Sequence, residues 1–504
     1  MPLRPSRLSS RRVKCEGVRL PRMIAVGFAA HSPYPDESIC RDLIHNYLLD
    51  QKTSAALRMY GVTSLPSGGD LHFAEACIAL DIPLRVILPL PSESLLGYFD
   101  EPTRNRANEV IRRALSIEIV ESDGSLDERQ YECGIEIVLQ SQLLLAFTDD
   151  LNTQNRADKF TEFARQMGRP VVWINGPQGD VQSSHSQQLQ TVYHDAELEF
   201  LNRLPADSTR HADESPRAIA EDWLIKLDEN ALHIAPQVRR LAAIPIILTA
   251  TAAFASGAAP RMHSMGTWLG AGAVVGLMAA VLPDVLRLRK RQALWVRIRT
   301  AAEVSRSVLA LWPLPGRYRI VGPEILPELT GMVLALNYLK SEAERTKDGT
   351  VELFKKHYLQ TRLLHQKDYF SRQAQKSAEQ ARRYRLVAKA CTVIAVMMSA
   401  WIFISQSAIH IGFVPSRRWW VPLIASAFFQ IATIAGALVV VYDCERRQKR
   451  YRELQWALGT WDIEMRALHT WPAVSKVVSK IERALMVELL EWRSLLQNMK
   501  MPRN

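Results

Sequence analysis

Residues suited to binding a phosphate or a sugar hydroxyl occur in short segments of the N-terminal third of the chain. Ser67, Gly68, Gly69 and Asp70 follow a short apolar run and open a segment with the composition of an apolar helix. Glycines at such a position let backbone N–H groups approach an anion, and the positive end of the helix dipole strengthens the attraction. A plain turn, with Asp70 as the helix cap, explains these residues about as well.

Further polar residues lie where other apolar runs end. His31 follows the first run, and Asp149 and Asp150 end the fifth, where carboxylates can accept hydrogen bonds from ribose hydroxyls. Arg156 could contact a phosphate, although an exposed loop arginine needs no special role. We expect no catalytic residue, no metal ligand and no resident cofactor. The predicted ligand-binding residues are Gly27, His31, Ser67, Gly68, Gly69, Asp70, Glu75, Thr148, Asp149, Asp150 and Arg156.

The elements that must position these residues alternate between strand and helix. Apolar runs predict strands at Met23–Ala29, Tyr60–Leu65, Leu84–Pro89, Ile117–Val120, Gln142–Thr148 and Pro170–Ile174. The helices predicted between them are Cys40–Leu49, Leu71–Leu80, Asn105–Ala114, Cys133–Leu139 and Lys159–Met167. This alternation predicts an α/β domain with a Rossmann-like, doubly wound parallel sheet, whose ligands bind beyond the carboxyl ends of the strands. The polar segments fall at those ends.

The chain carries a net charge of +11 over 504 residues. Such a charge is compatible with nucleic-acid binding, but the Arg and Lys cluster beside long apolar segments, where they would meet anionic lipid headgroups. Six cysteines without CxxC or Cys/His spacing indicate scattered thiols rather than a zinc site or a disulfide frame. Residues 1–21 contain many Arg and no apolar signal segment, and are expected to form a disordered basic leader or to result from a misassigned start.

Four apolar segments in the C-terminal half have the length of membrane-spanning helices and form two hairpins. Each approaches the ~20 residues that cross about 30 Å of hydrocarbon. A buried-core interpretation exists for the Ala-rich first segment, but four such runs flanked by Arg would make an unusual soluble core. The predicted spans are Leu241–Ala259, Met265–Leu286, Leu386–Ser405 and Trp420–Tyr442.

Each hairpin is followed by the same signature, and the two copies are displaced by 159 residues. Accidental agreement between two unrelated basic helices is the alternative. The constant offset predicts instead a duplicated two-span unit, followed by long cytosolic helices. Those helices would pack within one subunit or at an oligomer interface. The matched positions are Asp284, Arg287, Lys290, Arg291, Trp312 and Pro313 in the first copy and Asp443, Arg446, Lys449, Arg450, Trp471 and Pro472 in the second.

The Arg and Lys around the spans predict their orientation. Basic residues precede the first and third spans and follow the second and fourth, so the positive-inside rule puts both termini in the cytoplasm. Arg261, Arg417 and Arg418, on the opposite side, weaken the asymmetry only slightly. The topology is therefore expected to be multi-pass with cytosolic ends.

The predicted spans contain small and polar residues but no central Asp, Glu, Lys or Arg, which argues against a proton-coupled transporter. Gln430 and Thr433 lie near the middle of the fourth span and need a partner or water. Pore lining or an interhelical hydrogen bond would each provide one. Small residues along the second span would allow close helix contact. They are Gly266, Gly270, Gly272 and Gly276.

One combination of segments in the N-terminal domain is similar to a known family. It comprises residues 65–91 (LPSGGDLHFAEACIALDIPLRVILPLP), Tyr131 with Cys133-Gly134, and residues 143–150 and 168–175. These segments resemble the SLOG superfamily, the Rossmann-like relatives of the LOG nucleotide phosphoribohydrolases and the Smf/DprA proteins. The resemblance covers most of residues 22–175 and implies a nucleotide-binding domain.

Departures from the family pattern argue against catalysis. Ala-His-Ser at residues 30–32 stands where this branch often has Gly-His-Arg. Asn-Arg-Ala at residues 155–157 replaces the Gly-Gly-Thr phosphate loop, and the Pro-Gly-Gly-x-Gly-Thr-x-x-Glu motif of the hydrolytic enzymes is missing. The resemblance then implies a sensor of a nucleotide-derived signal, related to NAD or ADP-ribose, rather than an enzyme.

The duplicated two-span unit with its trailing basic helix resembles the SLATT type of membrane domain. In bacterial conflict systems, that resemblance implies a membrane-perturbing or pore-forming effector paired with a nucleotide-sensing domain. We therefore expect an antiviral, anti-phage effector in the bacterial inner membrane. Its expected partners are the lipid bilayer, a nucleotide second messenger and further copies of itself, but no nucleic acid.

Two other function classes stay open. One is a membrane-anchored hydrolase that cleaves NAD or a nucleoside monophosphate, with Glu75 or Asp70 as the acid/base; the other is a scaffold that binds a protein. A helix predicted at Pro216–Leu241 would transmit movement to the first span or act as a tether. The expected domains are a leader (1–21), the nucleotide-binding domain (22–175), a linker (176–216), the first two-span unit (217–322), cytosolic helices (323–385) and the second two-span unit (386–504).

Overall fold

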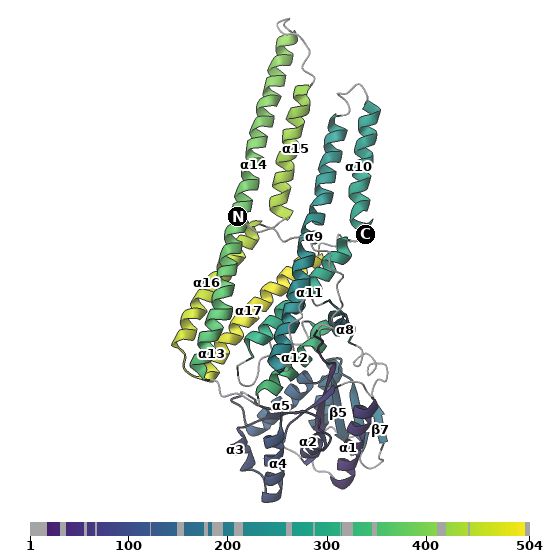
Figure 1. Cartoon of the computed structure of the whole chain (residues 1–504), viewed down its shortest axis with the longest axis vertical. Helices are drawn as coiled ribbons and strands as arrows, with labels where there is room; N and C mark the ends of the chain where they lie inside the picture. The colour runs from purple at the N-terminus through teal and green to yellow at the C-terminus, as the bar shows by residue number, and fades with distance from the viewer. Residues whose placement is uncertain are drawn as a thin grey trace, which may run out of the picture. The chain divides into compact units, whose positions relative to one another are not determined.

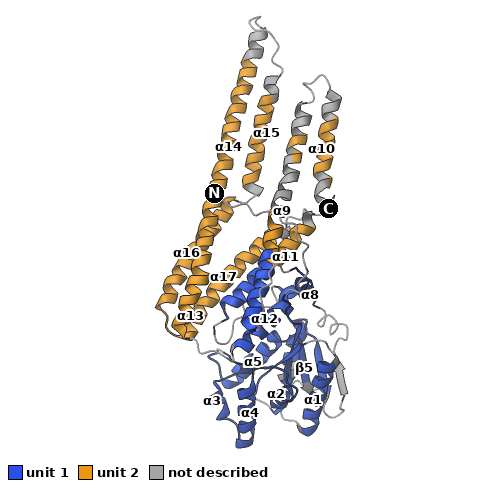
Figure 2. Ribbon diagram, in the orientation of Figure 1, with its two compact units in different colours: residues 1–229, 301–349 blue, residues 230–300, 350–504 orange. Residues whose placement is uncertain are grey.

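A computed structural model describes most of the chain, which divides into two compact units (Figure 2). The sheet unit comprises residues 1–229 and 301–349, and the helical unit residues 230–300 and 350–504. The described residues are 18–30, 37–54, 58–65, 68–120, 122–148, 156–175, 180–183, 195–205, 215–258, 265–285, 288–312, 314, 326–344, 350–410, 420–441 and 444–498.

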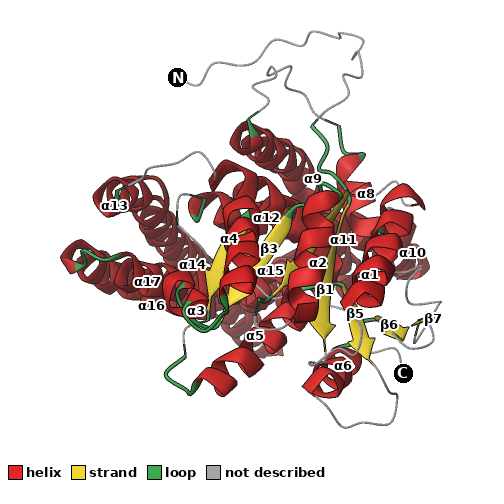
Figure 3. Cartoon of the chain, turned by 90° about the horizontal axis from the view of Figure 1, so that it is seen from below, coloured by secondary structure: helices red, strands yellow, loops and turns green. Residues whose placement is uncertain are grey.

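The sheet unit is built on seven strands (Figure 3). They are β1 (Met23–Ala30), β2 (Arg58–Thr63), β3 (Leu84–Leu88), β4 (Ser116–Ile119), β5 (Leu143–Thr148), β6 (Val171–Asn175) and β7 (Asp180–Ser183). Their order is β4-β3-β2-β1-β5-β6-β7, and all neighbours are parallel except β6 and β7. The continuous apolar sequence of β1 is explained by its burial in the middle of the sheet, since both faces of such a strand are covered.

Helices cover both faces of this sheet. Alternate residues of β1 point to opposite faces: Phe28 stacks on Phe73 of α2, with 4.8 Å between ring centroids, whereas a Cβ on Gly27 would lie 2.7 Å from Ser141 Oγ, just beyond α5. Helices α1, α2 and α4 pack together on one face, and α5 and α6 on the other. The bounds are α1 (Glu37–Ser54), α2 (Gly68–Ala79), α3 (Ser92–Leu96), α4 (Glu101–Arg113), α5 (Leu126–Gln140) and α6 (Arg156–Gln166).

Arg85 of β3 ties a later helix to this sheet. Its guanidinium donates to Gln140 Oε1 at 3.0 Å and to Ser341 Oγ, on α12, at 3.4 Å. The remaining helices of the sheet unit include the first part of α9 and the last part of α11. Their bounds are α8 (Ala196–Asn202), α9 (Pro216–Ala258), α11 (Leu288–Ala310), η2 (Pro327–Leu329) and α12 (Thr330–Glu344).

Residues 18–21 belong to the sheet unit, so the expectation that they form part of a disordered leader is wrong. Leu20 is buried; its backbone N–H donates to Asn202 Oδ1 at 2.9 Å, and its carbonyl accepts from Asn202 Nδ2 at 3.0 Å. Lys226 donates to the carbonyl of Val18 at 3.2 Å. These bonds satisfy backbone groups that burial would otherwise leave unpaired. Residues 1–17 lie outside the described part of the chain.

The helical unit is made of long helices in its described part (Figure 1). Helix α13 (Val351–Tyr358), the π-helical segment η3 (Leu359–Leu363) and α14 (Leu364–His410) form one uninterrupted helical run. Helix α14 packs along α15 and α16, and α16 packs on α17. The other bounds are α10 (Met265–Val285), α15 (Trp420–Val441), α16 (Cys444–Ala467) and α17 (Trp471–Asn498).

Two helices of this unit are long and apolar enough to cross a membrane. They lie within the runs Val351–Ile404 and Ile424–Ala467, and only 11% and 19% of their most apolar windows is buried. Trp401 and Phe403 of α14 are 59% and 74% exposed. A core helix of a soluble protein would bury such side chains. The described residues of the first predicted hairpin contain one shorter apolar helix, Gly270–Ala279.

The predicted parallel sheet is confirmed, and every predicted strand lies within two residues of an observed one. Helix α5 begins at Leu126, well before the predicted Cys133. Strand β7 was not predicted, because its sequence Asp-Val-Gln-Ser lacks an apolar pattern. Antiparallel pairing with β6 forms this strand within the predicted linker.

Candidate functional site

The strand order identifies the edge of the sheet where a ligand is expected. The chain moves outward from β1 to β4 and then returns to place β5 beside β1, so the connections diverge between these two strands. In doubly wound sheets, ligands bind beyond the carboxyl ends at such a switch point. Residues 31–36 and 149–155 follow these two strands and lie outside the described part, as do His31, Asp149 and Asp150.

Gly68, Gly69 and Asp70 are the first three residues of helix α2, which begins three residues before the predicted Leu71. The first backbone N–H groups of a helix have no partner within it and point toward any anion beyond the end. Asp70 is buried in this first turn, and Thr63 Oγ1, at the end of β2, lies 3.5 Å from its Oδ1. Asp70 therefore lies inside the helix and is not its N-cap residue, whereas a ligand contact at this helix start remains compatible with the geometry. Ser67 lies outside the described residues.

Glu75 lies farther along α2 and forms a two-pronged ion pair with Arg106 of α4. Arg106 Nε donates to Glu75 Oε1 at 2.7 Å, and Arg106 Nη2 donates to Oε2 at 2.9 Å. The same Nη2 lies 3.1 Å from Nδ1 of the buried His72. The fork of a guanidinium matches a carboxylate or phosphate in this geometry. No local spacing links Arg106 to Glu75, so only the fold brings them together.

The ion pair with Arg106 determines the protonation state of Glu75. Burial alone would raise the pKa of Glu75, but the hydrogen bonds and charges of Arg106 and His72 outweigh it and lower the pKa to about 2. The carboxyl group is therefore ionised near neutral pH and cannot donate a proton. This weakens the hydrolase alternative wherever it relies on Glu75 as a general acid.

Ser64, between β2 and α2, is a candidate site residue that the sequence did not single out. It is 3% exposed, and its Oγ has no hydrogen-bond partner among the described residues. A buried hydroxyl in that state retains capacity to bind a polar ligand group. Its position at a strand end is the only signal in the sequence that could have identified it.

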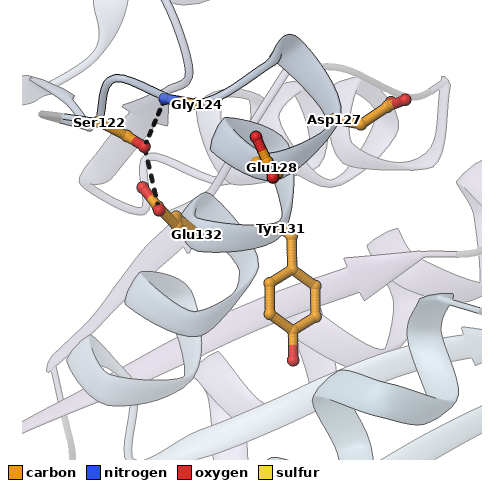
Figure 4. A pocket seen from close by; sticks show the side chains of 6 residues that line it. All are labelled: Ser122, Gly124, Asp127, Glu128, Tyr131 and Glu132. Atoms are coloured by element: carbon orange, nitrogen blue, oxygen red, sulfur yellow. Dashed lines mark hydrogen bonds between the residues drawn. The ribbon is translucent and has the colours of Figure 1, made fainter.

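A hollow of about 470 Å³ lies at the start of α5, away from the glycine-rich start of α2 in the sequence (Figure 4). Ser125 and Glu128 form a capping box there, which fixes the start of the helix. Ser122 Oγ donates to Glu132 Oε1 at 3.0 Å and accepts from Gly124 N at 3.3 Å. With Asp127, Glu128 and Glu132 in its lining, this hollow repels phosphate.

Packing contacts explain Gly134 and Tyr131, which belong to the segments that resemble the SLOG superfamily, and also Gly27. A Cβ on Gly134 would lie 2.1 Å from the ring of Phe160 on α6, and the Tyr131 ring lies 5.5 Å from that of Phe160. Gly27 lies within β1 against Ser141 and Ile137 and so is explained by close packing rather than by a ligand. Thr148 and Arg156 are described by their backbone only, at the end of β5 and the start of α6.

The predicted polar and small residues of the spans are only partly explained by the structure. Thr433 Oγ1 donates to the carbonyl of Phe429, on its own helix, at 2.9 Å, so it needs no partner on another helix. Gln430 is half-buried. A Cβ on Gly276 would make an ordinary contact, 3.7 Å, with Ala252 of α9, whereas Gly270 faces open space. Gly272 is buried, and only the backbone of Gly266 is described.

No protein-family model matches the chain, and no curated protein matches it.

Proposed function

We propose that the protein is a membrane effector, with a sheet unit that senses a nucleotide-derived ligand and a helical unit that acts on the bilayer. The observation that carries the membrane part is the exposure of large apolar side chains on α14 and α15. Phe403, Ile404 and Phe429 are 74%, 63% and 61% exposed. Keeping apolar surface in water costs about 25 cal/mol per Å², whereas hydrocarbon removes that cost. Insertion of both helices into a membrane accounts for their surfaces.

In this proposal the first hairpin also spans the membrane, giving four spans in two repeated units. Each proposed copy contains a long helix, then one of 21 or 22 residues, then one of 23 or 24 residues. The 159-residue offset in the sequence supports the same duplication. Trp312 and Trp471 each follow the third helix of their copy. The charge distribution supports cytoplasmic termini.

The sensing part of the proposal rests on the carboxyl edge of the sheet. The glycine-rich start of α2 suits a phosphate, and the Ser64 hydroxyl suits a ribose hydroxyl. A ligand related to NAD or ADP-ribose carries both groups. Helix α9 continues without a break from Pro216 to Ala258, which supports transmission of movement toward the first span, although a simple tether needs no more.

The biological setting in the proposal comes from the two resemblances. SLOG-like and SLATT-like segments in one chain support an effector of a bacterial anti-phage or conflict system, acting as a homo-oligomer in the inner membrane. In this setting, ligand binding rearranges the spans and permeabilises the membrane, which stops growth of the infected cell.

The test combines binding with leakage. Full-length protein reconstituted in dye-loaded liposomes is expected to release dye when ADP-ribose or NAD is added, and calorimetry should register binding. Asp70→Ala is expected to lose both responses. Asp42→Ala, an exposed change on α1, serves as the matched control. Intact liposomes with bound ligand would refute the effector proposal.

The hydrolase alternative predicts a different outcome of the same experiment. NAD or a nucleoside monophosphate would be consumed by the full chain, and Asp70→Ala would abolish turnover without any change in dye release. A scaffold that only binds protein would give neither heat of nucleotide binding nor turnover.

A further inference from the structure

A hollow of about 800 Å³ lies within the helical unit, between α14 and the beginning of α16. The character of its lining changes along α14. The cationic half of the lining contains Arg382, Arg385 and Lys389 among Ala378, Ala381 and Leu386, and the apolar half contains Ala390, Val393 and Ile394. No Asp, Glu, Lys or Arg occurs between residues 390 and 410, so the change coincides with the start of the apolar part of α14.

The dimensions of this hollow match the boundary of a bilayer. Arg382 and Ile394 are twelve residues apart, which corresponds to about 18 Å along a helix. Half of a bilayer, with its headgroup region included, is about 20 Å thick. A molecule lying along this face would therefore meet cations at one end and hydrocarbon-like surface at the other.

The charge of the lining favours an anion. Arg385 forms an ion pair with Glu445 of α16, which neutralises the one carboxylate in the lining. Arg382 and Lys389 are exposed and have no ion-pair partner among the described residues. Three cationic groups and one carboxylate leave a net charge of +2. Such cations at a membrane surface attract acidic headgroups.

We propose that this hollow binds one anionic phospholipid from the membrane, an inference that rests on the proposed insertion of α14. The phosphate lies between Arg382 and Lys389, and an acyl chain lies along Val393 and Ile394. Phosphate free in solution would use only the cationic half. A lining that is cationic at one end of its α14 face and apolar at the other therefore favours a lipid as the occupant.

Native mass spectrometry of the full chain tests this site. Protein in neutral detergent, mixed with equal amounts of phosphatidylglycerol and phosphatidylcholine, is expected to retain one phosphatidylglycerol. The double variant Arg382→Gln/Lys389→Gln should retain at least about tenfold less. Arg372→Gln/Lys376→Gln removes the same charge from exposed positions of α14 outside the hollow and is the matched control.

Two further measurements separate a lipid site from general electrostatics. Ala390→Trp fills the apolar half without changing charge and should also abolish retention. Glycerol 3-phosphate, which has no acyl chain, should not displace the lipid. Equal retention by the two double variants, or displacement by glycerol 3-phosphate, would overturn the proposal.

Carbonate extraction of membranes distinguishes failure of this site from failure of the proposed function. A wild-type chain that is released by carbonate refutes membrane insertion itself. A chain that stays in the membrane but does not prefer phosphatidylglycerol refutes only the lipid site. Far-UV circular dichroism checks that each variant keeps its helices.

Discussion

Two arginine–glutamate pairs differ in burial between the sheet unit and the helical unit. In the sheet unit, the side chains of Arg106 and Glu75 are 34% and 32% exposed. In the helical unit, those of Arg362 and Glu482 are 5% and 2% exposed. Both pairs use two nitrogens and two oxygens of the same groups. The chemistry is shared, and only the access of water differs.

The difference in exposure determines how easily each pair can be separated. Solvent screens the partly exposed pair, so Arg106 and Glu75 can separate at small cost. The buried pair cannot, because each partner would be left as an uncompensated charge. Tyr358 also donates to Glu482, at 2.7 Å, and completes a buried cluster that holds α17 against the run from α13 to α14.

The largest expected effect follows from breaking the buried pair. Glu482→Ala should lower the free energy of unfolding of the helical unit by about 3–5 kcal/mol, because Arg362 would stay buried without its carboxylate. Denaturant unfolding of the full chain in detergent, followed by circular dichroism, measures the loss. The double change Arg362→Met/Glu482→Leu removes both charges and should recover most of the stability. If the single and double variants lose the same free energy of unfolding, the effect comes from lost packing and not from the unpaired charge of Arg362.

The contribution of a third glutamate, Glu488, is expected to depend on pH. Burial raises the pKa of Glu488 to about 7, against the opposing charge of Arg450, whose Nη2 lies 3.1 Å from Glu488 Oε1. Since the folded pKa lies above the unfolded one, the stabilising contribution is complete below about pH 4.5 and disappears as the pH rises through about 7. The loss is expected to be roughly 3 kcal/mol.

Thermal unfolding of wild type and Glu488→Gln between pH 5 and 8 tests this prediction. The wild type should lose stability across that range, while the variant should lose much less. Glu491→Gln removes a neighbouring negative charge that helps to raise this pKa, so this variant should keep the pH dependence and shift it to lower pH. A flat wild-type profile would contradict the prediction.

A smaller effect is expected from the half-exposed pair. Glu75→Gln should cost about 1 kcal/mol, because solvent already screens this pair. The lowered pKa of Glu75 predicts that its contribution is present above about pH 4.5 and is lost as the pH falls toward about 2. Acid unfolding of the wild type and of Glu75→Gln measures both the loss of stability and its pH dependence. A loss as large as that of Glu482→Ala would remove the contrast between the pairs.

The smallest effect is expected at a fully exposed pair. Glu109 forms ion pairs with Arg112 and Arg113 of the same helix, α4. All three side chains are exposed to water. Glu109→Gln should leave the unfolding midpoint unchanged, because surface pairs of this kind contribute little. A clear shift in the midpoint would mean that exposure does not predict how much each ion pair contributes to the free energy of unfolding.

The parallel sheet could be predicted because its strands are buried on both faces and read as short apolar runs between polar residues. Gly68–Asp70 could be predicted for a similar reason: a glycine pair before an apolar helix is a local pattern. Arg106 could not, since it lies 31 residues from Glu75 and meets it only after α2 and α4 pack together. The role of Gly27 depends on Ser141, which is equally remote in the sequence.

The π-helical segment η3 has a consequence for everything beyond it. A π turn is closed by i→i+5 hydrogen bonds and holds one residue more than an α turn, which turns the following helix by about 100° about its own axis. The angular setting of α14, and therefore the direction in which Arg382 and Lys389 face, is fixed by this one turn. Arg362 lies in this π turn and donates to Glu482 of α17. The buried ion pair therefore holds the π turn, and with it the rotation of α14, in one setting. Loss of the extra residue would rotate the apolar length of α14 while moving it only about 1.5 Å along its axis.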